Sequence, residues 1–220
     1  MGRSLTGETV RIVKKTFVRL PDQYHRARMT QTQKSEEQSM SVSEMTYRNV
    51  ALEDPEGHWE LACGHLRRKP SMTADHNRIA FELAFRLREQ LDRQEFQVRS
   101  NSGHVRHTAS SYYIPDVLVI PAALERAQRV GRSLEYYQEP MPLVVEVWSP
   151  STGDYDVETK LVEYQRRGDL EIWLVHPYER TVIAWVRQLD GAYRKYTFAS
   201  GYVHPTALPD VGIDLDTLFD

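Results

Sequence analysis

The stretch "PLVVEVW" at residues 142–148 constrains the fold more than any other part of the chain. Its apolar residues follow one another without alternation, and such a run predicts a strand that is covered on both faces. The strand therefore belongs to the middle of a sheet with other elements packed on each side. Glu146 interrupts the run, and burying a carboxylate is costly unless it is paired or binds a cation.

A second apolar run also contains a single carboxylate. In "IPDVLVI" at 114–120, Asp116 follows a proline, which is typical of the first positions of a strand. If the two strands pair, Asp116 and Glu146 can converge on one point. Mg²⁺ is usually held by one or two carboxylates together with waters and phosphate oxygens, so the pair is a candidate Mg²⁺ site. A structural ion pair is the alternative for each carboxylate.

The remaining pattern predicts a hairpin, a helix, three strands, a second helix and further strands. The segment 73–92 is the clearest helix, with Thr73 as N-cap and one apolar stripe, and a tight hairpin turn falls at Cys63–Gly64. Strands are expected at 95–100, 112–120, 142–148, 170–177 and 181–187, and the second helix at about 155–167. The stretch 121–140 is polar and predicts a long surface loop or short helix, a candidate lid or substrate-contacting insertion.

Composition limits the class of protein. The 220 residues suit one domain, and 28 Lys+Arg against 31 Asp+Glu give a net charge of −3, so any anionic partner needs a local positive patch. A single cysteine, Cys63, excludes an internal disulfide, and no long apolar segment opens the chain. We therefore expect a cytoplasmic protein without a membrane segment. The polar stretch 29–43 predicts a flexible linker, so residues 1–44 form a partly flexible extension and 45–220 the domain.

A polar stripe follows Glu146 on the second predicted helix. Asp156, Lys160 and Tyr164 are spaced four residues apart and so share one face. That face either meets solvent, where the Asp156–Lys160 pair would be an ordinary surface ion pair, or meets the strand ends. In the second case Lys160 could stabilise charge on a phosphate or orient a water.

The order of these motifs resembles the Uma2 family of restriction-endonuclease-like proteins. The resemblance rests on "ELACGHL", "PDVLVI", "PLVVEVWSPST", "LEIWLVHP" and "GIDLDTLF", and it runs from about residue 45 to the C-terminus. It implies an α/β (mixed α+β) fold of the PD-(D/E)xK superfamily. Such a fold has a restriction-endonuclease-like core, in which a mixed central β-sheet is flanked by helices, here with an N-terminal β-hairpin. The implied chemistry is metal-dependent hydrolysis of phosphodiester bonds.

Carried onto this chain, the resemblance makes Asp116 and Glu146 ligands of Mg²⁺, which Mn²⁺ can replace, with the backbone carbonyl of Val147 as a further ligand. The superfamily pattern has lysine two residues after the glutamate, but this chain has Trp148 there. In the Uma2 pattern the lysine comes from the following helix. The resemblance therefore assigns the catalytic lysine to Lys160.

Further residues are candidates for the site. Glu60 matches a family glutamate, with an ordinary strand-surface role as the alternative, and His76 is expected to be a structural histidine, with a substrate-facing or proton-transfer role as the alternative. The chain departs from the family at Cys63 and His176, where relatives usually carry aspartate. Basic residues that could contact a nucleic-acid backbone, or simply face solvent, are Arg67, Arg68, Lys69, Arg99, Arg106, Arg166 and Arg167.

The expected function is that of a Mg²⁺-dependent endonuclease whose partner is nucleic acid, with DNA favoured. A homodimer that cuts two strands is compatible with the resemblance. The alternatives are a catalytically inactive nucleic-acid-binding or assembly module of the same fold, and a purely structural ion-pair network.

Overall fold

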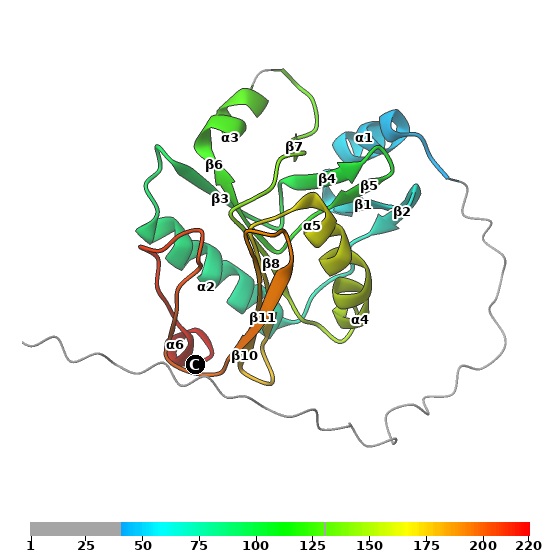
Figure 1. The fold of residues 1–220 in the computed structure, drawn as a ribbon. Coiled ribbons are helices and arrows are strands. Elements are labelled where there is room, and N and C mark those ends of the chain that lie inside the picture. Colours follow the sequence, from blue (N-terminus) through cyan, green and yellow to red (C-terminus); the bar gives the residue numbers. More distant parts are fainter. Residues whose placement is uncertain (1–40, 130) are drawn as a thin grey trace, which may run out of the picture.

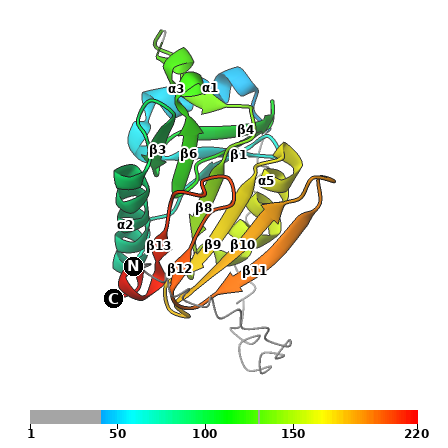
Figure 2. The ribbon, with the colours of Figure 1, turned by 60° about the vertical axis from the view of Figure 1, so that its left-hand side comes forward.

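The computed structural model describes residues 41–129 and 131–220, so the predictions for residues 1–40 lie outside it. Its central sheet has six strands in the order β11-β10-β9-β8-β6-β3, and Figure 2 shows them side by side. Their bounds are β3 Phe96–Ser100, β6 Val117–Pro121, β8 Leu143–Val147, β9 Glu171–His176, β10 Thr181–Arg187 and β11 Tyr193–Phe198. In this sheet β8 and β9 run parallel and the other neighbours antiparallel, so the predicted mixed sheet is confirmed.

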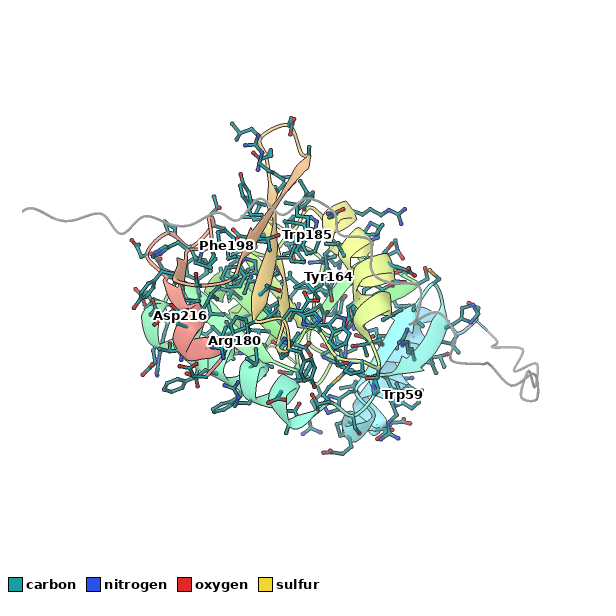
Figure 3. All side chains as sticks on the ribbon, turned by 90° about the horizontal axis from the view of Figure 1, so that it is seen from below. Trp59, Tyr164, Arg180, Trp185, Phe198 and Asp216 are labelled. Atoms are coloured by element: carbon teal, nitrogen blue, oxygen red, sulfur yellow. The ribbon has the colours of Figure 1, made fainter. Side chains whose placement is uncertain are left out.

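Both faces of the central sheet are covered, as the run at 142–148 predicts. Helix α2 (Ala74–Gln90) begins after its N-cap Thr73 and packs Ile79, Leu83 and Leu87 against one face. The opposite face packs against Tyr164 of α5 (Leu161–Arg167) and against the second sheet. Figure 1 shows α2 on one side of the strands and α4 and α5 on the other, and Figure 3 shows the side chains that fill the spaces between them.

The hairpin belongs to the second sheet, whose order is β2-β1-β5-β4-β7. Strands β1 (Trp59–Ala62) and β2 (His65–Arg68) are joined by Cys63 and Gly64, both with positive φ, 51° and 84°. Positive φ at both central residues is the geometry of a type I′ turn, which confirms the predicted tight hairpin. The other strands are β4 His104–Thr108, β5 Ser111–Tyr113 and β7 Tyr136–Tyr137.

The single strand predicted at 112–120 is wrong, because the chain forms β5 and β6 with residues 114–116 between them. This break moves the chain from the second sheet to the central one. The stretch 121–140 contains the short helix α3 (Ala122–Gln128), one of its two predicted alternatives, and also the strand β7, which was not predicted. Elements for which the sequence patterns gave no range are α1 (Glu44–Glu53), η2 (Pro55–Gly57), β4, β11, β12 (Tyr202–Val203), β13 (Ile213–Asp214) and α6 (Leu215–Leu218).

The second predicted helix spans α4 (Gly153–Tyr155), η3 (Asp156–Lys160) and α5, and it ends at Gly168 with φ 81°. Segment η3 is a π-helical turn in which the N–H of Leu161 donates to the carbonyl of Asp156. Such wide turns inside α-helices often occur at functional sites. Within the described ranges, every helix is too short or too polar to cross a membrane.

Candidate functional site

Asp116 and Glu146 come together because their strands pair. Residue 117 of β6 lies opposite residue 145 of β8, and Asp116 stands one position before β6. The backbone N–H of Val147 donates to Asp116 Oδ2 at 2.7 Å, so the aspartate is fixed beside the end of β8. Both carboxylates are buried, with 1% and 3% of their surface exposed. The predicted pairing of the two strands is therefore confirmed.

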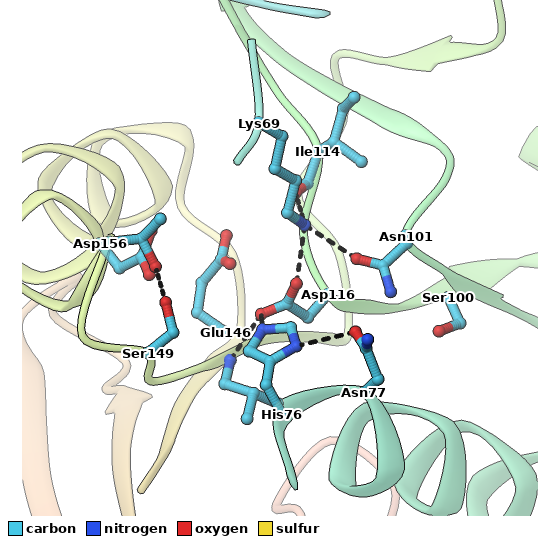
Figure 4. Close-up of polar contacts among 12 residues, drawn as sticks. Lys69, His76, Asn77, Ser100, Asn101, Ile114, Asp116, Glu146, Ser149 and Asp156 are labelled. Carbon is cyan, nitrogen blue, oxygen red and sulfur yellow. Dashed lines mark hydrogen bonds and ion pairs between the residues drawn. The ribbon is translucent and has the colours of Figure 1, made fainter. Parts of the chain in front are cut away.

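Two basic side chains hold the Asp116 carboxylate in place (Figure 4). Lys69 Nζ lies 2.7 Å from Oδ1, and His76 Nε2 lies 2.9 Å from Oδ2. Lys69 also donates to Asn101 Oδ1 and to the carbonyl of Ile114, each at 3.0 Å. His76 lies in the first turn of α2, so the N-terminus of that helix is joined directly to the candidate site.

The stripe on η3 and α5 faces the strands rather than solvent. Lys160 Nζ lies 3.2 Å from Glu146 Oε1, 2.9 Å from Glu60 Oε1 and 3.5 Å from Asp156 Oδ1. The hydroxyl of Tyr164 donates to Glu146 Oε1 at 2.5 Å. The exposed surface pair is therefore the wrong alternative for Asp156 and Lys160, because both side chains are buried.

Burial and neighbouring charge move the pKa values of the two central carboxyls in opposite directions. Burial alone would raise the pKa of Asp116, but Lys69 and the hydrogen bond from His76 outweigh it and hold that pKa below its ordinary value. Burial raises the pKa of Glu146 to about 8, despite the opposing charge of Lys160. Burial also raises the pKa of Asp156. Lys160 has a pKa well above its ordinary value, because its carboxylate neighbours outweigh its burial, so it remains charged.

The cluster contains more carboxyl groups than ammonium groups, which favours the binding of a cation. Four carboxyl groups, those of Glu60, Asp116, Glu146 and Asp156, face the ammonium groups of Lys69 and Lys160. Asp156 Oδ1 is buried and accepts no hydrogen bond within the described structure, although Lys160 is in ion-pair range. An unsatisfied oxygen and an excess of carboxylates are features that a divalent cation would relieve.

The donor set fits Mg²⁺ rather than a metal held wholly by side chains. Among residues 41–129 and 131–220, no three acidic, histidine or cysteine side chains are grouped as a ready-made metal site. Mg²⁺ commonly needs only one or two protein carboxylates, with waters and substrate oxygens as the other ligands. Peptide groups alternate along a strand, and the N–H of Val147 faces Asp116 while that of Trp148 faces β9. The carbonyl of Val147 therefore also faces the Asp116 side, as its predicted role requires.

The additional candidates Glu60 and His76 are both buried. Glu60 Oε1 accepts the N–H of Ile114 at 2.9 Å and contacts Lys160, so its strand-surface alternative is wrong. The ring of His76 bonds to Asp116 and, at 3.4 Å, to Asn77 Oδ1, as expected for a structural histidine. Its position orients the aspartate. Whether these residues act in catalysis stays a prediction.

Of the basic residues predicted to contact nucleic acid, five interact with other side chains of the protein and two line a pocket. Arg167 is wrong as a phosphate contact, because its buried guanidinium pairs with Asp169 and donates to backbone carbonyls. Arg99, Arg106 and Arg166 each pair with glutamates, and Arg67 lies over the ring of Tyr155, 3.3 Å from its centroid. Arg68 and Lys69 instead line a pocket of about 590 Å³.

Sequence reasoning missed the direct partners of Asp116. Lys69 was predicted only as a contact to a nucleic-acid backbone. Asn77, which bonds to His76, and Asn101, which accepts from Lys69, were not predicted at all. Lys69 and Asp116 are 47 residues apart and lie on segments without a periodic pattern. The one available signal was the position of Lys69 between the hairpin and the N-cap of the helix that carries His76.

Comparisons with known proteins agree with this architecture. The family model of Uma2, described as "Putative restriction endonuclease", matches residues 45–216. Among solved structures, a crystal structure described as "a putative nuclease belonging to DUF820" from Anabaena variabilis shares the fold, with a TM-score of 0.62 and 17% identity, over 74% of this chain and 90% of that one. No curated protein matches the chain. Because the family model covers most of the sequence, the chain belongs to the Uma2 family.

Proposed function

We propose that the protein is a Mg²⁺-dependent endonuclease that hydrolyses phosphodiester bonds of nucleic acid, with DNA as the expected substrate. The observation that supports this proposal is that two buried carboxylates, those of Asp116 and Glu146, come from paired strands, with Asp116 bonded to the backbone of Val147 at the end of β8. The description of the Uma2 family supports the same reaction class. Mn²⁺ is expected to replace Mg²⁺, because both accept oxygen ligands.

In the proposed reaction, a water oxygen forms a bond to phosphorus and the bond between phosphorus and O3′ breaks. The proton that the water loses passes to solvent, the O3′ oxygen takes up a proton, and a 5′-phosphate remains. When bound, the metal would supply positive charge at the phosphate and acidify the water. Asp116, Glu146 and the carbonyl of Val147 would hold it. Lys69 and His76 fix Asp116, and Lys160 and Tyr164 fix Glu146, so the ligands need little rearrangement.

A cleavage assay on single- and double-stranded DNA and RNA with Mg²⁺ or Mn²⁺ tests the proposal. We expect metal-dependent cleavage by the wild type, and a loss of at least about 10²-fold in Asp116→Asn and Glu146→Gln, because each removes a charged metal ligand. Arg180→Gln, a change at an exposed residue outside the site, serves as the control. Cleavage that persists in both ligand variants would place the chemistry elsewhere.

One observation favours the alternative function, a catalytically inactive nucleic-acid-binding or assembly module. Asp116 and Glu146 already form ion pairs with Lys69 and Lys160. Calorimetric titration with Mg²⁺ and Mn²⁺ separates the two functions. A nuclease requires binding that Asp116→Asn and Glu146→Gln weaken. If the wild type binds neither metal, the cluster is a structural ion-pair network.

A further inference from the structure

The two buried lysines of the site have very different surroundings. Lys160 is 3% exposed at its side chain, and its ammonium is held by Glu60, Glu146 and Asp156. The positive charge of an ammonium enclosed by three carboxylates is already balanced by them. Moving it toward a substrate would leave those buried carboxylates without a partner. Lys160 is therefore suited to positioning Glu146, and it is poorly suited to contacting a substrate.

Lys69 combines a contact to Asp116 with access to open space. Its ammonium lies 2.7 Å from Asp116 Oδ1, and the residue also lines the pocket of about 590 Å³. A lysine has three donors, and those of Lys69 go to Asp116, Asn101 and Ile114. Lys69 makes one carboxylate contact where Lys160 makes three, so a phosphate oxygen in the pocket could replace one of its neutral acceptors.

The pocket has the chemistry of an anion site. Its lining includes the exposed residues Arg68 and His58 and the side-chain amides of Asn77 and Asn101 beside Lys69. One carboxylate, that of Glu56, also lines it. In Figure 4, Asn101 and Asn77 lie on the side of Asp116 away from Asp156, and Lys69 bonds to both Asp116 and Asn101. Because Lys69, Asn77 and Asn101 all line the pocket, the pocket adjoins the candidate metal ligand.

We propose that Lys69, rather than Lys160, is the catalytic lysine, and that it contacts the substrate phosphate in a pocket formed with Arg68 and His58. This inference rests on the proposed nuclease function and names the lysine of that same site. Lys69 would stabilise negative charge on the phosphate as the water attacks, while Lys160 remains a positioning residue. The ligand recognised by the pocket is a phosphodiester of the nucleic-acid backbone.

The test compares Lys69→Met with Lys160→Met in the full chain, on an oligonucleotide that the wild type cleaves with Mn²⁺. We expect Lys69→Met to lower the melting temperature less than Lys160→Met does, because His76 still pairs with Asp116, and to lose about 10²- to 10³-fold in kcat, as when one electrostatic stabiliser is removed. Lys69→Arg should recover at least a tenth of the wild-type kcat, because it restores a positive donor. Lys160→Met should lower the melting temperature. A folded Lys69→Met with at least half of the wild-type kcat would overturn the proposal.

A second measurement does not depend on turnover or on the stability of Lys69→Met. Inorganic phosphate, titrated by calorimetry into the wild type and into Arg68→Ala, should bind at least tenfold more weakly to the variant. Equal affinity of the wild type and Arg68→Ala for phosphate would contradict the proposed phosphate-binding role of the pocket. If the wild type binds phosphate through Arg68 but cleaves no nucleic acid with either metal, the nuclease function fails while the pocket stands.

Discussion

At the scale of single residues, the site depends on a buried acid whose proton affinity differs between the folded and unfolded chain. Glu146 has a pKa of about 8 in the folded protein, against an ordinary value of 4.5. The folded state therefore binds more protons than the unfolded state between these two values, so its stability falls as the pH rises through that window. Asp116 has the opposite shift, and its contribution is lost only as the pH falls below its ordinary value.

We predict that Glu146 lowers the free energy of unfolding as the pH rises from 5 to 8, so that Glu146→Gln removes this contribution from the pH dependence. The amide stays neutral at every pH and can still accept from Tyr164, which now donates to Glu146 Oε1. Urea unfolding at pH 5, 6, 7 and 8 measures the effect. Glu158→Gln, a change at an exposed glutamate on η3, is the matched control and should leave the slope unchanged. An identical slope in wild type and Glu146→Gln would contradict the prediction.

Removing the ammonium of Lys160 has a separate consequence for stability. Lys160→Met leaves Glu60, Glu146 and Asp156 without their shared partner, and breaking a buried charge pair costs about 3–5 kcal/mol. Urea unfolding at pH 7 measures this loss. The exposed Lys195 provides the control, and Lys195→Met should change the free energy of unfolding by no more than about 0.5 kcal/mol. Similar values for the two variants would mean that the buried cluster is not stabilised by Lys160.

At the scale of elements, the start of α2 supports the site as well as the helix. Thr73 accepts the N–H of His76 at 3.3 Å and also bonds the hydroxyl of Tyr178. Thr73→Ala should cost about 1 kcal/mol in urea unfolding, the usual value for a lost N-cap. Thr73→Ser keeps the hydroxyl and should retain most of that stability. If the alanine and serine variants unfold alike, the cap contributes nothing through its oxygen.

The sequence predicted elements wherever apolar spacing was strong. Helix α2 and strands β8, β9 and β10 follow from continuous or periodic apolar residues, and their bounds agree closely with the structure. Strand β4, "HVRHT", has one apolar residue, and α1, "EMTYRNVALE", is half polar and buries only Tyr47 and Ala51, so neither pattern stands out. The break at 114–116 was missed because apolar residues stand on both sides of it, although Pro115 and Asp116 interrupt the run where the chain passes from one sheet to the other.

The candidate site was predictable only in part, for a related reason. Asp116 and Glu146 can be picked out from the sequence because each is a carboxylate within an apolar run. Lys69 lies in "RRKP", where another basic residue does not stand out. Its contact with Asp116 follows only from how β2 and β6 are placed in space. The inward direction of Lys160 likewise depends on how α5 packs on the sheet, which spacing alone leaves open.

At the scale of the whole molecule, the folded unit begins before the first strand. Tyr47 of α1 is fully buried and donates its hydroxyl to the carbonyl of Trp59, and Glu44 pairs with Arg106. The N–H of Val42 donates to the carbonyl of Gly64, so residues just before α1 also contact the hairpin. The contacts described for the domain thus reach back to about residue 42, close to the start of the Uma2 match at residue 45.

We predict that a chain starting at Ser41 folds like the full chain, with a free energy of unfolding within about 0.5 kcal/mol of it and the same metal-dependent cleavage. A chain starting at Pro55 lacks α1 and should lose at least about 3 kcal/mol, because Leu61 and Tyr112 lose the packing of Tyr47. Urea unfolding and the cleavage assay on all three chains measure this. A marked loss of stability on removing residues 1–40 would place part of the folded unit in that segment, and equal stability of all three chains would make α1 dispensable.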